Sequence, residues 1–180
     1  LGDVYKRQLM KCICGFLIPT EGEVIVNGKR VGKDVDFPPG LGLIIETPGF
    51  LPNMTGVKNL EILASLNKKI GLEEIAASIR RVGLDPLMKK PVGKYSLGMR
   101  QRLGIAQAIM EDPTLLILDE PLNGLDKHGV REMRQLIKGL KEQGKTILLA
   151  SHNQGDIDEL CDTVCEMDAG VMTMIREESI

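Results

Sequence analysis

The apolar positions of this chain follow two kinds of pattern, which are clearest in its second half. Two continuous apolar runs, at 115–118 and 146–150, predict strands buried on both faces of a parallel sheet. Between them, residues 130–141 repeat apolar side chains at helical spacing, which predicts an amphipathic helix. A strand, a helix and a second strand at this distance form a right-handed βαβ unit. The pattern therefore predicts an α/β fold with parallel strands.

Shorter patterns predict the other elements. The end of a helix is expected at 9–16, and complete helices are expected over 56–66, 73–82 and 96–110. One more buried strand is expected over 41–45, and two hairpins over 24–31 and 164–175. The first hairpin has Asn27-Gly28 at its turn, a pair typical of tight two-residue connections.

Polar residues follow both strands of the βαβ unit. Asp119 and Glu120 end the first strand, and His152 lies just beyond the second. Parallel strands end at the same edge of a sheet, and ligands of α/β sheets bind at that edge. We therefore expect two acids and an imidazole to share one site. The alternative is that Asp119-Glu120 only caps a turn and that His152 is an ordinary loop residue.

Composition narrows the function classes. The 180 residues include 23 Lys and Arg and 25 Asp and Glu, so the formal net charge is −2. This near-zero charge, with 3% aromatic residues and no Trp, argues against a basic groove or a stacking platform for nucleic acid. No apolar run approaches the roughly 18 residues that span a bilayer. Any membrane role is therefore expected to depend on a partner.

The four cysteines do not have the spacing of a metal site. Cys12 and Cys14 are separated by one residue, and Cys161 and Cys165 lie four apart, whereas a four-thiolate site uses paired Cys-x-x-Cys motifs. We expect buried thiols that behave as small apolar side chains in a reducing compartment. No secretory signal pattern is visible, so a cytoplasmic location is expected.

Four motifs follow one another along the second half. They are Tyr95-Ser-Leu-Gly-Met-Arg-Gln-Arg-Leu103, Leu115-Leu-Ile-Leu-Asp-Glu-Pro121, Asn123-Gly-Leu-Asp126 and Ser151-His152. In this order they resemble the signature motif, Walker B strand, D-loop and switch histidine of ATP-binding cassette (ABC) transporter nucleotide-binding domains. The resemblance covers about 9–175. It implies a P-loop NTPase-like α/β domain with a mainly parallel sheet, a helical subdomain at about 50–110, and ATP and Mg²⁺ as cofactors.

The resemblance also implies a role for each residue of the strand ends and of the signature motif. Asp119 would bind Mg²⁺, mostly through water, because this ion keeps much of its hydration. Glu120 would orient or deprotonate the water that attacks the γ-phosphate, and His152 would contact that phosphate. Ser96 and Gly98 open a helix whose N-terminus would reach the γ-phosphate of a nucleotide bound mainly to the other subunit. Ser96 can equally be a plain N-cap.

Two further residues take roles by the same resemblance. Asp126 ends the D-loop, which crosses the dimer interface in this family; a helix N-cap is the alternative and is compatible. Glu46 stands where the family normally has glutamine, and bacitracin-resistance and lantibiotic-immunity ATPases share this glutamate. There it would act near phosphate, with Mg²⁺ or water between them; the alternative is an exposed loop acid. Tyr-Ser-Leu-Gly-Met, in place of Leu-Ser-Gly-Gly-Gln, points to the same subgroup.

The phosphate loop of the family is missing. Its motif Gly-x-x-x-x-Gly-Lys-Ser/Thr should end immediately before Leu9, but residues 1–8 read Leu-Gly-Asp-Val-Tyr-Lys-Arg-Gln. Lys6 is in register with the motif lysine, whereas Tyr5 replaces the glycine and Arg7-Gln8 replaces the hydroxyl pair. We expect 1–8 to be a foreign or truncated segment and 9–180 to be a partial ABC ATPase domain that lacks its first strands. Weak or no ATP binding by this chain alone follows.

These expectations favour the ATP-hydrolysing subunit of a membrane exporter for antimicrobial peptides or similar amphiphiles, which would confer antibiotic resistance. Its partners would be a transmembrane permease and, head to tail, a second copy or a second ABC subunit; its place would be the inner face of the membrane. One alternative is a non-catalytic remnant that only pairs with a partner. Another, a soluble ABC ATPase acting on ribosomes or DNA, usually needs a second cassette or a long insertion. The polar segment 153–158 has no functional explanation from sequence.

Overall fold

A computed structural model describes residues 2–46 and 48–177, so Leu1 of the segment 1–8 lies outside the described residues. Its centre is a sheet of three strands in the order β3 (Leu41–Ile44), β4 (Leu115–Asp119) and β5 (Thr146–Ala150). Both pairings are parallel. The α/β fold with a parallel sheet is confirmed, and the carboxyl ends of the three strands meet at one edge.

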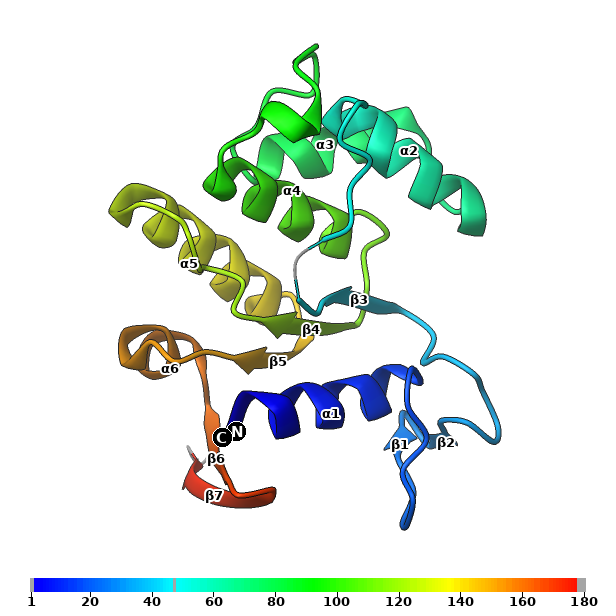
Figure 1. Cartoon of the computed structure of the whole chain (residues 1–180), viewed down its shortest axis with the longest axis vertical. Helices are drawn as coiled ribbons and strands as arrows, with labels where there is room; N and C mark the ends of the chain where they lie inside the picture. The colour runs from blue at the N-terminus through cyan, green and yellow to red at the C-terminus, as the bar shows by residue number, and fades with distance from the viewer. Residues whose placement is uncertain (1, 47, 178–180) are drawn as a thin grey trace.

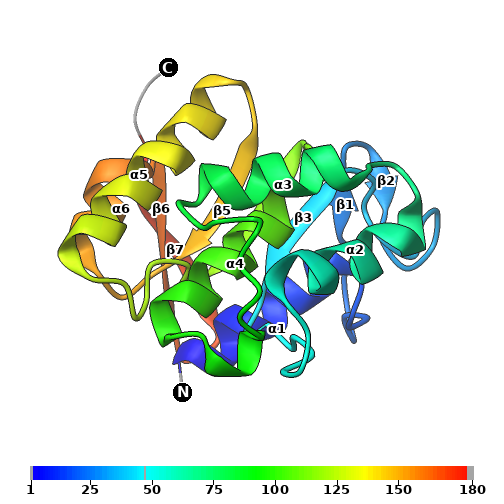
Figure 2. The same cartoon turned by 90° about the horizontal axis from the view of Figure 1, so that it is seen from above.

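Helices cover both faces of this sheet (Figure 1). Helix α1 (Gly2–Cys14) lies on one face, and α4 (Leu97–Ile109) and α5 (Lys127–Glu142) lie on the other. Helices α2 (Gly56–Asn67) and α3 (Leu72–Arg81) pack on the far side of α4 as a helical layer. Figure 2, seen from above, shows α4 in the centre, with α5 to one side and α2 to the other.

Several short elements complete the described chain. They are the hairpin of β1 (Ile25–Val26) and β2 (Lys29–Arg30), the 3₁₀ turn η1 (Val92–Lys94), helix α6 (Gln154–Leu160), and the hairpin of β6 (Thr163–Asp168) and β7 (Val171–Glu177). Each expected helix, strand and hairpin is present. The first helix differs, because it begins at Gly2 and runs without a break through the segment whose structure the sequence did not predict.

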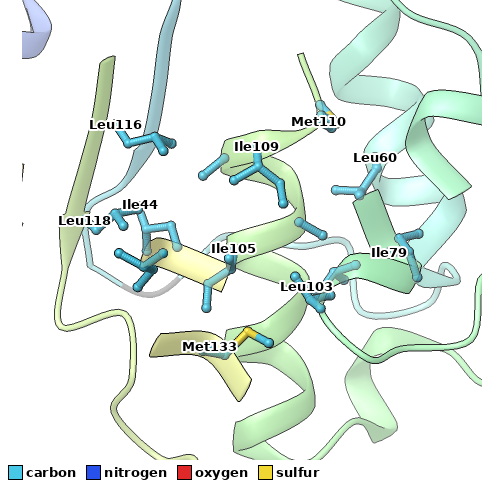
Figure 3. Close-up of a cluster of buried hydrophobic side chains, with 14 of the residues drawn as sticks. Ile44, Leu60, Ile79, Leu103, Ile105, Ile109, Met110, Leu116, Leu118 and Met133 are labelled. Carbon is cyan, nitrogen blue, oxygen red and sulfur yellow. The ribbon is translucent and has the colours of Figure 1, made fainter. Parts of the chain in front are cut away.

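Successive side chains of β4 point to opposite faces of the sheet and so contribute to two buried clusters, one on each face. Leu116 and Leu118 point towards α4 and α5, where they join a buried cluster that includes Leu103 and Met133 (Figure 3). Ile117 points the other way and packs against Met10 and other residues of α1. Asp119 has the parity of Ile117, so its carboxylate emerges on the α1 side of the sheet edge.

Four of the helices have a polar N-cap residue whose side chain accepts a backbone N–H of the first turn. Ser96 accepts the backbone N–H of Met99 at 3.1 Å at the start of α4, and Asp126 accepts the N–H of Gly129 at 2.8 Å at the start of α5. Thr55 caps α2 in the same way, and Asn153 caps α6. The N-cap interpretations of Ser96 and Asp126 are therefore confirmed.

The cysteines depart from the expected burial. Cys14 is buried beneath the sheet, and burial raises the pKa of its thiol to about 11. Cys12 and Cys161 are half-buried, and Cys165 is exposed because it lies on the open hairpin of β6 and β7. The expectation of buried thiols is thus wrong for Cys165. Within the described ranges, no helix has the length and apolar character needed to cross a membrane.

Helix α4 approaches β3 so closely that only glycine fits at position 42. A β-carbon there would lie 2.0 Å from the carbonyl oxygen of Ala108. We predict that Gly42→Ala lowers the free energy of unfolding by about 1–3 kcal/mol through overpacking. Urea denaturation followed by circular dichroism measures the change.

Gly139 provides the matched control. It lies inside α5, where an added β-carbon meets nothing within 4 Å. Gly139→Ala should stabilise the protein by about 0.5–1 kcal/mol, because alanine favours helix. Equal effects of the two substitutions would contradict the close packing of α4 on β3.

Candidate functional site

Two of the sheet strands bring an acid and an imidazole together. Glu120 directly follows β4, and its N–H donates to the carbonyl of Ala150 at 2.9 Å, which extends the pairing with β5 by one residue. His152 lies two residues beyond the end of β5. Its Nε2 is 3.7 Å from Oε1 of Glu120. Glu120 and His152 thus open onto the same edge of the sheet.

The surroundings of Glu120 favour the protonated form of its carboxyl group. Its Oε1 is buried and has no hydrogen-bond partner among the described residues. Burial raises the pKa of Glu120, and the nearby His152 opposes that shift. The backbone of Glu120 has φ +47°, a left-handed conformation that is uncommon for a residue with a β-carbon. Such backbone strain is typical of functional sites.

Asp119 is buried beside Glu120, and a residue of α1 forms an ion pair with the carboxylate of Asp119. Arg7 Nε donates to Oδ2 of Asp119 at 2.7 Å, and this contact raises the pKa of Arg7. A hard carboxylate oxygen at this position has the chemistry that Mg²⁺ prefers. In this structure the cation paired with Oδ2 of Asp119 is the guanidinium of Arg7.

The first turns of α1 also contact His152. Asp3 Oδ1 lies 2.6 Å from His152 Nε2, and Lys6 Nζ lies 2.8 Å from Asp3 Oδ1 and 3.2 Å from the imidazole. Lys6 and His152 together lower the pKa of Asp3 to about 2. A continuous helix with charged side chains therefore lies against the strand ends, in place of a glycine-rich turn.

Glu46 extends the same edge beyond β3. It is exposed, and its φ of +63° places it in a left-handed turn just after the strand. Lys11 of α1 pairs with Glu46 at 2.8 Å and lowers the pKa of this carboxyl. All three strands thus end in acidic or imidazole side chains near α1.

The signature and D-loop residues form a second group, at the starts of α4 and α5. A β-carbon added at Gly98 would lie 3.2 Å from the carbonyl oxygen of Gly124, so these two segments touch. Ser96 is exposed and Gly98 is half-buried. Asp126, which caps α5, is exposed as well. Ser96 therefore remains open to a partner molecule.

The sequence pattern missed a buried network behind His152. Asp156 of α6 is buried, accepts Nε of Arg134 at 2.9 Å, and also accepts the hydroxyl of Ser151 at 3.1 Å. The Ser151 oxygen in turn accepts the N–H of Asn153 at 3.1 Å. The residues on both sides of His152 are therefore held in place. The only signal in the sequence is the polar run that begins at Asn153.

A groove of about 280 Å³ runs between the end of β3 and α2. Asn59 of α2 is buried at its floor, and its side chain bonds the backbone N–H and carbonyl of Leu51, which fixes the loop before α2. The other lining residues are mostly apolar: Leu43, Ile44, Ile45, Pro48, Gly49, Phe50, Ile62, Leu63 and Gln107.

Comparison with known proteins identifies the family. A family model described as ABC transporter matches residues 6–123. The chain belongs to the ABC transporter family. An uncharacterized ABC transporter ATP-binding protein of Bacillus subtilis, YybJ, is 42% identical over 92% of this chain and 76% of its own length. Asp119 at the end of β4 and Glu120 after it both fall inside the matched range.

Two relatives in this ABC family have names that refer to the transport of bacitracin or of a lantibiotic. The bacitracin transport ATP-binding protein BcrA of Enterococcus faecalis is 41% identical over 92% of this chain and 54% of its own length. The lantibiotic transport ATP-binding protein SrtF of Streptococcus pyogenes is 35% identical over 96% and 74%. The chain therefore spans between about half and three quarters of these relatives.

Solved structures show the same ABC cassette fold. The ATP-binding cassette MJ0796, in a dimeric post-hydrolysis state bound to ADP and Pi, matches with a TM-score of 0.80 at 19% identity. The match covers 95% of this chain and 81% of that one. A second dimeric structure of MJ0796, a bacterial ABC transporter cassette, gives the same TM-score at 21% identity.

The raised pKa of Glu120 predicts a pH-dependent effect of its removal. A raised pKa in the folded state stabilises the protein at low pH, and this stabilisation is lost as the pH rises through that pKa. Glu120→Gln, which stays neutral, should therefore be more stable than the parent at pH 7.5. The difference should shrink as the pH falls towards 4.5, the ordinary pKa of the group.

Thermal unfolding between pH 5 and pH 7.5 measures the difference. Glu142→Gln, at an exposed position near the end of α5, corrects for the loss of one charge. A Glu120→Gln protein that is less stable than the parent at pH 7.5 would show that the carboxylate is stabilised by its surroundings.

Proposed function

We propose that this chain is the ATP-binding and ATP-hydrolysing part of a membrane exporter for antimicrobial peptides or similar amphiphiles. The observation that carries the proposal is the approach of Glu120 and His152 to 3.7 Å at the edge of the parallel sheet. Membership of the ABC transporter family supports the ATPase activity. The names of BcrA and SrtF, which refer to bacitracin and lantibiotic transport, support the substrate class.

In the proposed reaction, Glu120 accepts a proton from the water that attacks the γ-phosphate. Its buried Oε1 and raised pKa suit a general base, and His152 would hold the phosphate oxygen or the water in line. Asp119 would hold Mg²⁺ through water, and the ion would neutralise charge on the phosphates. Glu46 would lie near the phosphates, with this ion or a water molecule between them.

Ser96 and Gly98 take the remaining role in this proposal. The N-terminus of α4 carries backbone N–H groups and a positive dipole end that favour an anion. We place there the γ-phosphate of a nucleotide bound mainly to a second copy or a second ABC subunit, with Asp126 at the interface. The exposure of Ser96 supports this placement.

The segment 1–8 does not supply a phosphate loop. It is helical from Gly2, and its Arg7 forms an ion pair with the carboxylate of Asp119. We therefore propose that 1–8 is foreign or truncated, that 9–180 is the partial ATPase domain, and that this chain alone binds ATP weakly. The Arg7–Asp119 contact also favours a second candidate function, a non-catalytic module that only pairs with a partner.

We place the permease contact at the groove between β3 and α2. Apolar residues of the loop after Glu46 and of α2 line this groove, and Leu66 of α2 is an exposed apolar side chain on the same helix. A transmembrane permease bound there would hold the chain at the inner face of the membrane. The helical subdomain at about 50–110 would then transmit motion of the permease to Glu46.

Restoring the phosphate loop separates the two candidate functions. Replacing 1–8 by a strand and a Gly-x-x-x-x-Gly-Lys-Ser/Thr loop should give Mg²⁺-dependent ATP hydrolysis, measured by phosphate release. The chain as it stands should give no micromolar affinity for ATP in titration calorimetry. Persistent inactivity of the restored chain would favour the non-catalytic module.

Glu120→Gln in the restored chain tests the assigned base. Loss of a general base should lower kcat by roughly a hundredfold or more. The variant should then accumulate as an ATP-bound dimer, seen by light scattering after size exclusion. Glu142→Gln is the control and should keep the parent rate. Hydrolysis at the parent rate by Glu120→Gln would contradict the assignment of Glu120 as the general base.

A further inference from the structure

We propose that Gln101 is a positioning residue that holds the backbone of Glu120 in the conformation needed for hydrolysis. Gln101 lies in the second turn of α4, and its Nε2 donates to two consecutive carbonyl oxygens. The distances are 3.1 Å to Glu120 and 2.9 Å to Pro121. The inference rests on the proposed role of Glu120 as the base.

The turn at Glu120 needs an external support. Its φ of +47° is unfavourable for a residue with a β-carbon, and the following Pro121 has no N–H and restricts the residue before it. A strained conformation persists only where neighbouring groups fix it. The Glu120 carbonyl accepts the N–H of Asn123 at 3.2 Å from within the turn and the amide of Gln101 from outside it.

Packing of α4 does not depend on Gln101. The adjacent Arg102 donates to the carbonyl of Val82, the C-cap of α3, at 2.6 Å and pairs with Glu132 of α5 at 2.6 Å, which ties α4 to the end of α3 and to α5. Leu103 is fully buried in the core. Removing the Gln101 amide should therefore release the Glu120 turn and leave the helix in place.

Gln101 also connects the two groups of site residues. The helix that begins at Ser96 carries Gln101 in its next turn, and Gln101 bonds the turn that carries Glu120. On the proposed function, Ser96 contacts the partner's nucleotide, while Glu120 acts on the chain's own nucleotide. A displacement of α4 caused by the partner's nucleotide at Ser96 would thus reach Glu120, the base that acts on the chain's own nucleotide.

Hydrogen exchange of the chain as it stands tests the positioning contact. In Gln101→Leu, which keeps the volume and loses both donated bonds, the segment 119–126 should exchange about tenfold faster. Segments 127–142 and 146–150 should not change. Gln101→Lys restores a donor and should restore slow exchange. Gln135→Leu, at an exposed position of α5, is the control and should match the parent.

The catalytic consequence is measured in the chain with a restored phosphate loop. Gln101→Leu should lower kcat by about tenfold and leave KM for ATP unchanged, and Gln101→Lys should recover the rate. Unchanged exchange in Gln101→Leu, or faster exchange with kcat unchanged, overturns the proposal. If the restored parent hydrolyses no ATP, the proposed function fails, while the exchange experiment still decides whether Gln101 holds the turn.

Discussion

The parallel pairing of β4 with both β3 and β5 is the constraint on which the rest of this structure depends. Because the three strands run in one direction, Glu46, Glu120 and His152 are all delivered to one edge. Antiparallel pairing of either neighbour would send its polar residues to the opposite end of the sheet. The register matters as well, since the pairing of Asp119 with Ala150 brings the residues that follow them to the same level.

Buried packing on both faces fixes this edge. Leu116 and Leu118 anchor β4 to α4 and α5, and Ile117 anchors it to α1. The site residues themselves are then held by polar contacts: Arg134 and Asp156 behind His152, and Gln101 behind Glu120. The hydrophobic core thus determines where the strand ends lie, and hydrogen bonds determine how the residues after them are directed.

The sequence predicted the elements well, because apolar periodicity and cap residues are local signals. The run at 115–118 and the helix start at Ser96 are two examples. It did not predict contacts between residues far apart in the chain, such as Gln101 with Glu120 or Arg134 with Asp156, since spacing alone does not show which polar side chain faces which. The helix over 2–8 was not predicted either, because this stretch holds only two adjacent apolar residues and so shows no helical periodicity of its own.

The most direct test of the central claim is a crystal structure of the chain with a restored phosphate loop, bound to Mg²⁺ and a non-hydrolysable ATP analogue. We expect the γ-phosphate to lie between Glu120 and His152 of one copy and Ser96 of a second copy. A γ-phosphate that binds away from the carboxyl ends of β4 and β5, or a dimer that leaves Ser96 facing solvent, would contradict it.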